Sequence, residues 1–185
     1  MTPSGQVLFK SRKWLPYIFG QEHGYNYDSK LKGWLSDYVE GSVLALSKEL
    51  YSKLLDSQGQ VMDPRFFVYC EDVDLGQAVR GFGVGPFVLE SKNFVHEVSA
   101  SSGGKASPLV YYYITRNRIL LAQKWLPFPL RILFYLYYSL SRIGLLLVHL
   151  LYGRYQIFLA VIQGATDGLL GRFGKWKKHD NYLAK

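Results

Sequence analysis

The sequence predicts a mixed α/β fold followed by amphipathic helices. In the first half, short runs of β-branched and aromatic residues are separated by glycine-containing turns, which is typical of short strands. Helix starts with a capping serine occur at Ser47 and at Ser107, where proline follows at the first helical position. Residues 130–152 are almost wholly apolar. A small sheet with helices, followed by apolar helices, accounts for all three observations.

Composition narrows the class of protein. The 185 residues are 49% apolar and 16% aromatic, which excludes a disordered chain and suffices for a hydrophobic core. The formal charge of +8 suits an anionic partner, either phosphate-bearing or an acidic membrane. The lysines and arginines form no basic run interleaved with aromatics, so we expect no nucleic-acid binding. The single cysteine, Cys70, fits a reducing compartment, and the N-terminus has no apolar signal region, so no secretion is expected.

The N-terminal third contains one predicted strand and one predicted helix. Residues 1–33 are weakly patterned and are expected to be irregular. Residues 34–46 form a strand candidate that Gly41 and Ser42 interrupt. A glycine at such a place marks a bulge, a close approach of a ligand to the backbone, or close packing against an aromatic neighbour. Ser47 then caps a helix that is expected to reach residue 55.

The centre of the chain is an aromatic run that leads directly into carboxylates. Residues 63–70 are predicted to form a buried strand, and residues 72–80 a short helix that ends before a glycine. Glu71, Asp72 and Asp74 fall at the start of this helix, where the positive end of the helix dipole stabilises ionised carboxylates. They either cap the helix or present a general base at the rim of the core.

Two further strands and a long helix follow. Strands are predicted at residues 84–89 and 94–98, and His96 in the second is either a structural hydrogen-bonding residue or a metal ligand. The helix that begins after Ser107 is expected to reach residue 125 and carries Arg116 and Asn117. The planar guanidinium of Arg116 suits phosphate, and an ion pair with the carboxylates is the alternative.

The apolar stretch at residues 130–152 is predicted to be an amphipathic helix. Arg131, Arg142 and His149 fall on one stripe at helical spacing, opposite an aliphatic face. A helix in the membrane surface, with its arginines among anionic headgroups, avoids placing Arg142 in the middle of a bilayer. A true span, or packing on the rest of the chain or on a second copy, are the alternatives. Residues 164–174 are read as a helix end followed by turns, and the basic residues around Trp176 suit an anionic membrane.

Several motifs in this order resemble the C-terminal half of family 2 glycosyltransferases, especially the bacterial rhamnosyltransferase-like members. The resemblance covers roughly residues 34–125. It rests on Gly41-Ser42, on the run Asp63-Pro64-Arg65-Phe66-Phe67-Val68-Tyr69-Cys70-Glu71-Asp72-Val73-Asp74-Leu75, on Arg80-Gly81-Phe82-Gly83, on His96-Glu97-Val98-Ser99, and on Tyr112-Tyr113-Ile114-Thr115-Arg116-Asn117. It implies half of a nucleotide-sugar transferase domain of the GT-A type, with a short mixed sheet and helices.

The resemblance also implies roles for individual residues. Asp72 is the expected base, and Glu71 and Asp74 orient Asp72 or the acceptor. Gly41 and Ser42 lie near the acceptor pocket. His96 is the expected ligand of a divalent metal, Mn or Mg, and Arg116 and Asn117 lie near the donor diphosphate.

The predicted organisation has three parts: an irregular segment over residues 1–33, an acceptor-side half-domain over 34–126, and a membrane-associating helical region over 127–185. The expected function is inverting transfer of a sugar from a nucleotide-sugar donor to a cell-envelope glycan or lipid-linked acceptor. It would take place at the cytoplasmic face of the inner membrane, with the protein bound peripherally. The family's donor-binding half, with its Asp-x-Asp motif, has no counterpart before residue 34, so little independent catalysis is expected. The alternative is a non-catalytic, membrane-associated interaction module derived from such an enzyme.

Overall fold

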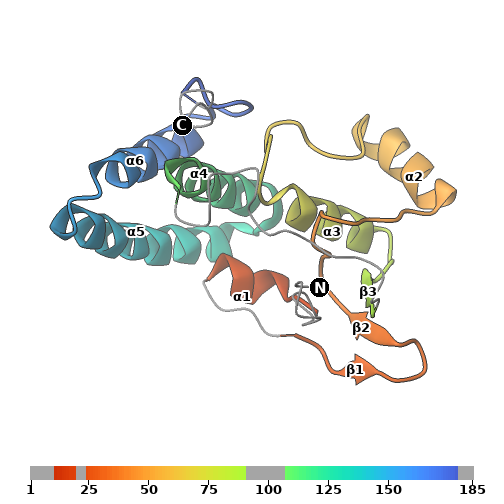
Figure 1. The fold of residues 1–185 in the computed structure, drawn as a ribbon. Helices are drawn as coiled ribbons and strands as arrows, with labels where there is room; N and C mark the ends of the chain where they lie inside the picture. Colours follow the sequence, from red (N-terminus) through yellow and green to blue (C-terminus); the bar gives the residue numbers. More distant parts are fainter. Residues whose placement is uncertain (1–10, 20–23, 91–106, 179–185) are drawn as a thin grey trace. The chain divides into compact units, whose positions relative to one another are not determined.

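A computed structural model describes residues 11–19, 24–90 and 107–178, and Figure 1 shows its elements. The elements in chain order are α1 (Trp14–Ile18), β1 (Tyr27–Asp28), β2 (Gly33–Leu35), α2 (Lys48–Gln58), α3 (Glu71–Gly81), β3 (Phe87–Leu89), α4 (Pro108–Trp125), α5 (Phe128–Leu151) and α6 (Tyr155–Leu169). The mixed α/β class is therefore confirmed. The strand order is β1-β2-β3 and both pairings are antiparallel, so the sheet in the described residues is not the mixed sheet that was expected.

The chain divides into two compact units. The first unit comprises residues 1–63 and 71–98, and the second unit comprises residues 64–70 and 99–185. Neither boundary follows the predicted divisions at residues 33 and 126. The helix predicted to complete the half-domain, α4, belongs with the apolar C-terminal helices in the second unit.

The sheet of the first unit is smaller than predicted and begins earlier in the chain. β2 pairs with β1 in the register Tyr27 to Trp34, and the two rings meet edge to face with centroids 4.9 Å apart. The expectation that residues 1–33 are irregular was therefore wrong for α1 and β1. The strand predicted over residues 34–46 was wrong beyond Leu35, because the chain leaves the sheet there.

Residues 36–42 run along α3 instead. A Cβ built on Gly76 of α3 would lie 2.7 Å from the carbonyl oxygen of Asp37, so only glycine allows this approach. The Arg80 guanidinium, in the last turn of α3, makes an ion pair of 2.7 Å with the buried Asp37 carboxylate. Asp37 also accepts hydrogen bonds from the Trp14 backbone N–H at 2.9 Å and from the Tyr25 hydroxyl at 2.8 Å. One carboxylate thus ties three segments of the first unit together.

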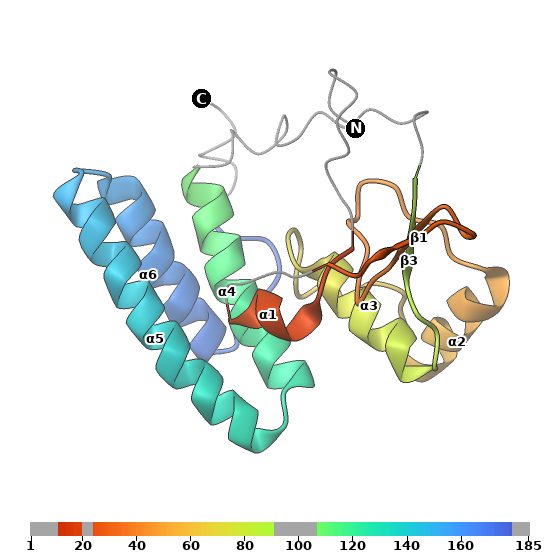
Figure 2. The same cartoon turned by 90° about the horizontal axis from the view of Figure 1, so that it is seen from below.

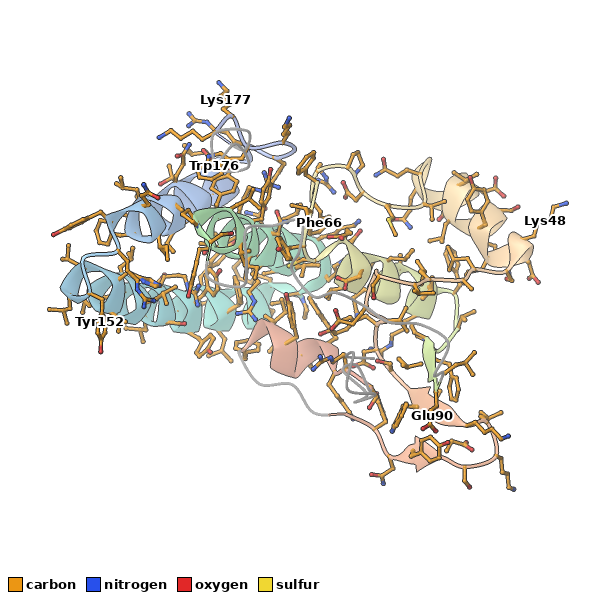
Figure 3. All side chains as sticks on the ribbon, in the orientation of Figure 1. Lys48, Phe66, Glu90, Tyr152, Trp176 and Lys177 are labelled. Atoms are coloured by element: carbon orange, nitrogen blue, oxygen red, sulfur yellow. The ribbon has the colours of Figure 1, made fainter. Side chains whose placement is uncertain are left out.

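The second unit is built around three helices that lie side by side (Figures 1 and 2). α4 and α6 approach closely, because Gly164 and Gly168 of α6 face α4. A Cβ on Gly164 would lie 2.6 Å from the carbonyl oxygen of Tyr112, and one on Gly168 would lie 3.2 Å from that of Arg116. The Tyr112 hydroxyl donates a 2.8 Å hydrogen bond to Asp167 of α6, and the Tyr112 ring stacks on Trp176, which follows this helix (Figure 3).

The helix starts predicted from the sequence are confirmed. The Ser47 side chain accepts a hydrogen bond from the Leu50 backbone N–H, and the Ser107 side chain accepts one from Val110. α5 covers the predicted apolar stretch. α6 continues past Gly164 to Leu169, so the turns begin later than expected.

The buried strand predicted over residues 63–70 was wrong. Phe67, Tyr69 and Cys70 have φ values of +64°, +65° and +70°, which lie in the left-handed region that non-glycine residues rarely occupy. This segment is an irregular loop that leads into α3. Its backbone carbonyls are taken by side chains of α4, as described below, and are not available to a neighbouring strand.

The residues of the polar stripe of α5 differ in burial: Arg131 and Arg142 are half-buried and His149 is buried. Arg131 donates a hydrogen bond of 3.0 Å to the Leu126 carbonyl, and the Arg142 guanidinium lies 4.8 Å from the centroid of the Tyr138 ring. His149 is buried, with its ring edge-to-face on Tyr111. Arg131 and Arg142 are half-buried, so the expectation that these arginines meet headgroups stays a prediction.

Candidate functional site

The predicted carboxylates lie in the first turn of α3, as expected. Glu71, Asp72 and Asp74 are all within this turn, Asp74 is buried, and the other two are half-buried. One oxygen of the Asp72 carboxylate accepts a 2.8 Å hydrogen bond from the Val73 backbone N–H. That contact fixes the Asp72 side chain at the N-terminus of the helix, where the helix dipole favours its ionised form.

Gly41 and Ser42 lie beside this helix start. A Cβ built on Gly41 would lie 3.7 Å from the Asp72 Cβ and 3.9 Å from Glu71 Oε1. Both Gly41 and Ser42 are exposed. The first unit therefore brings together two groups of residues that are about thirty positions apart in the sequence. Residues 36–42 run antiparallel to α3. Asp37 lies beside Arg80 in the last turn of this helix, so Gly41 lies beside Glu71 and Asp72 in its first turn.

Glu71 has an unusual electrostatic environment. Its Oε2 atom is buried and has no hydrogen-bond partner among the described residues. Burial, which disfavours the charged form, raises the pKa of Glu71 to about 7, and the neighbouring Asp72 carboxylate adds to the rise. A hydrogen bond from the residue's own backbone N–H opposes it. Near neutral pH this carboxyl group is therefore partly protonated, whereas an ordinary surface glutamate is ionised.

Arg116 and Asn117 belong to the second unit and are completely buried. The Arg116 guanidinium donates to the carbonyls of Gly174, Arg65 and Phe66 at 2.6, 3.1 and 2.8 Å. The Asn117 amide nitrogen lies within 3.0 Å of the carbonyl oxygens of Phe66, Val68 and Tyr69. These two side chains hold the loop at residues 64–70 in its left-handed conformation. Their implied role at a diphosphate stays a prediction, and in this conformation their donors are engaged by the protein.

The metal site also stays a prediction. His96, its expected ligand, lies outside the described residues. Within residues 11–19, 24–90 and 107–178, no three His, Cys, Asp or Glu side chains are grouped so that they could hold a metal ion.

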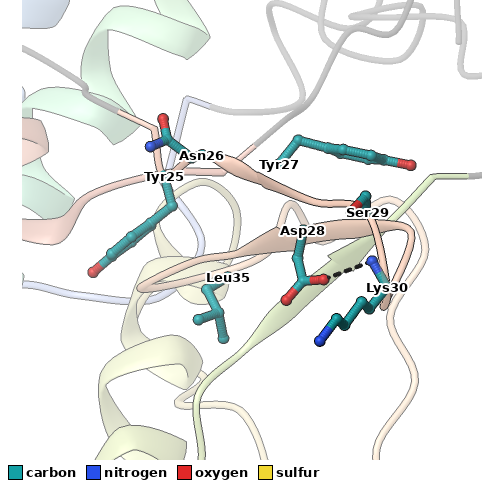
Figure 4. Close-up of a pocket in the computed structure, with 7 residues that line it drawn as sticks. All are labelled: Tyr25, Asn26, Tyr27, Asp28, Ser29, Lys30 and Leu35. Carbon is teal, nitrogen blue, oxygen red and sulfur yellow. Dashed lines mark hydrogen bonds between the residues drawn. The ribbon is translucent and has the colours of Figure 1, made fainter.

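A separate hollow of about 600 Å³ lies at the β1–β2 turn of the first unit (Figure 4). Its lining includes Tyr25, Tyr27 and Lys30, and none of the predicted site residues. Asp28 Oδ1 accepts hydrogen bonds from the backbone N–H groups of Lys30 and Leu31, so the Asp28 carboxylate stabilises the β1–β2 turn. The hollow therefore adds nothing to the site at α3.

Sequence reasoning missed the anchoring of the site by Asp37 and Arg80. Arg80 is singled out only as part of the motif Arg80-Gly81-Phe82-Gly83, and the partners of Asp37 come from segments 12 to 43 positions away, so the local sequence does not reveal their contacts. The glycine spacing Gly164-x-x-x-Gly168, in contrast, is a visible signal of close helix packing that the sequence reading did not use.

Comparison of the chain with protein-family models, with curated proteins and with solved structures gave no match.

Proposed function

We propose that the chain is the acceptor-side part of an inverting, family 2-like glycosyltransferase that acts on a cell-envelope glycan or a lipid-linked acceptor. The observation that carries the proposal is the proximity of Gly41 to Glu71 and Asp72 at the start of α3. The resemblance assigns these residues to the acceptor and to the base, and they come from two separate motifs. The exposed backbone at Gly41 and Ser42 leaves room for an acceptor hydroxyl beside the carboxylates.

In the proposed reaction, Asp72 accepts the proton of the acceptor hydroxyl. The acceptor oxygen forms a bond to the anomeric carbon from the face opposite the leaving group, and the nucleotide diphosphate leaves with the electron pair of the broken bond. Glu71 holds the site's spare proton at neutral pH, because its pKa of about 7 is well above the usual glutamate value. Two adjacent carboxyl groups with different affinities for a proton are suited to acid–base work. The resemblance assigns the divalent metal to His96, outside the described residues, and the diphosphate to Arg116 and Asn117, whose donors are engaged within the protein, so no step is derived through the metal or the donor.

The proposed location is the cytoplasmic face of the inner membrane, bound peripherally, where lipid-linked acceptors are found. Nucleotide-sugar donors are soluble, so only the acceptor requires contact with the membrane. The non-catalytic interaction module remains a second candidate, and the extended apolar surface of α5 favours it.

The test is Asp72→Asn in the protein as its own cells make it. Membranes from those cells are supplied with radiolabelled nucleotide sugars, and transfer of label to lipid or glycan is measured. We expect Asp72→Asn to lower transfer at least a hundredfold, since general-base catalysis typically contributes that much or more. Asp56→Asn, at an exposed acid on α2, is the matched control and should leave transfer unchanged. Full transfer by Asp72→Asn would remove Asp72 from the role of base. Absence of transfer from every donor by the unaltered protein would favour the interaction module.

A further inference from the structure

One face of α5 is exposed and carries no charged side chain. Its large aliphatic residues recur at three- and four-residue spacing and are between 48% and 82% exposed: Ile132, Leu136, Leu140, Ile143, Leu147 and Leu151. The polar side chains of the helix, Arg131, Arg142 and His149, lie on the other side. We call the six aliphatic residues the α5 apolar face. At 1.5 Å per residue, this 24-residue helix is about 36 Å long.

α6 also has an exposed apolar side. Tyr155, Leu159, Ile162 and Leu169 are 40% to 63% exposed along one side of this helix. Between the two helices, Tyr152 is 74% exposed and points away from them (Figure 3). Tyrosines at the end of an aliphatic surface are typical of the boundary between lipid and water.

Exposed apolar surface on this scale needs an occupant, because soluble monomers rarely expose contiguous patches beyond about 600 Å². A second copy is the first candidate. The second unit carries thirteen lysines and arginines and two acidic residues, a formal charge of +11, so pairing two such units brings like charges together. Protein interfaces also surround their apolar centre with a polar rim, whereas this face is aliphatic along the helix.

A bilayer surface accommodates both the positive charge of the second unit and its aliphatic face. Anionic headgroups complement the +11 charge, and acyl chains cover the aliphatic residues. α5 is long and apolar enough to cross a membrane by length and composition. However, the side with Arg142 and His149 packs within the helical unit, so a helix lying in the membrane plane buries the apolar face without moving these residues into lipid.

We propose that the α5 apolar face, extended by α6, inserts into one leaflet of a bilayer, and that insertion of aliphatic side chains, more than headgroup attraction, holds the protein there. This rests on the membrane association in the proposed function and makes it specific. The binding surface is uncharged, and Arg131 and Arg142 lie half-buried on the other side of the helix.

The test is flotation of the full chain with vesicles of pure phosphatidylcholine and with vesicles containing a fifth phosphatidylserine. The test variant is the double substitution Leu136→Glu and Leu140→Glu, at positions 63% and 71% exposed. The matched control places the same change on exposed leucines of the first unit, Leu31→Glu and Leu89→Glu, which are 57% and 69% exposed. Circular dichroism melting confirms that each variant folds.

We expect the unaltered chain and the control to float with neutral vesicles at 0.5 M salt, and the α5 variant to lose at least tenfold in binding. Three results would overturn the proposal: unchanged flotation of the α5 variant, flotation only with anionic vesicles at low salt, or a stable dimer in solution that the α5 variant dissociates. Asp72→Asn must float like the unaltered chain. Retained transfer by Asp72→Asn would contradict the proposed function, whereas retained flotation of the α5 variant would contradict membrane insertion, so the two failures are distinguishable.

Discussion

At the residue scale, Glu71 makes the free energy of unfolding depend on pH. Its pKa is about 7 in the folded chain and 4.5 when exposed, so the native state binds this proton more tightly than the unfolded chain does. The free energy of unfolding should therefore fall as the pH rises from 4.5 to 7. Glu71→Gln removes the buried charge, and we expect it to be more stable than the unaltered chain at pH 8 by roughly 1–3 kcal/mol. Urea unfolding at several pH values measures the difference.

The control for this prediction is Glu49→Gln on α2. The Glu49 carboxylate is exposed and its pKa is lowered by hydrogen bonding to Lys53, so its linkage has the opposite sign. This variant should keep the decline between pH 4.5 and 7. A decline that persists in Glu71→Gln would show that another group causes it.

Arg116 has a structural role that its local sequence does not reveal. A guanidinium on a helix suggests phosphate, but this one meets three carbonyls from segments about fifty residues away or more. Nothing in the local sequence reveals those partners. Burying a guanidinium costs so much free energy that its donors must be satisfied, and the 64–70 loop supplies the acceptors.

At the element scale, the helices were predictable where their signals are local. Ser47 and Ser107 cap their helices through contacts three residues away, which the sequence displays directly. The strands were predicted less well, because strand formation depends on distant partners: β3 lies within the strand predicted over residues 84–89, whereas only the start of the strand predicted over 34–46 belongs to the sheet. The β-prone run at residues 64–70 has its carbonyls taken by Arg116 and Asn117, and residues 36–42 pack on α3 because Gly76 permits it. The proximity of Gly41 to Glu71 followed from the resemblance alone, and the burial of Glu71 required the structure.

The packing of α6 on α4 gives a prediction at this scale. Gly164→Ala places a methyl group 2.6 Å from the Tyr112 carbonyl oxygen, so the helices must separate. We expect a loss of about 1–3 kcal/mol in the free energy of unfolding, as for overpacked cores. The control is Gly144→Ala on α5, where nothing lies within 4 Å of the new methyl group. It should be neutral or stabilise by up to about 1 kcal/mol through helix propensity. Urea unfolding followed by circular dichroism compares them, and equal stability of both variants would contradict the packing.

At the scale of the whole molecule, the charge is divided unequally. The first unit carries nine basic and twelve acidic residues, a formal charge of −3, whereas the second unit carries +11. The overall value of +8 conceals this asymmetry, which arises almost entirely from residues 99–185. An anionic surface attracts the second unit and repels the first, so the carboxylates of α3 should stay in water while the helices of the second unit bind lipid.

Site-specific fluorescence tests that arrangement. Cys70 is the only cysteine, so Cys70→Ser gives a background without thiols. A polarity-sensitive dye is attached to Leu140→Cys on α5 or to Asp56→Cys on α2, both at exposed positions. On addition of vesicles, the dye at residue 140 should shift to shorter wavelength and be quenched by lipids brominated in their acyl chains, because acyl chains surround it. The dye at residue 56 should show neither change. Equal shifts at both positions would mean that the protein adsorbs without a preferred face, and a shift at residue 56 alone would place the first unit on the membrane.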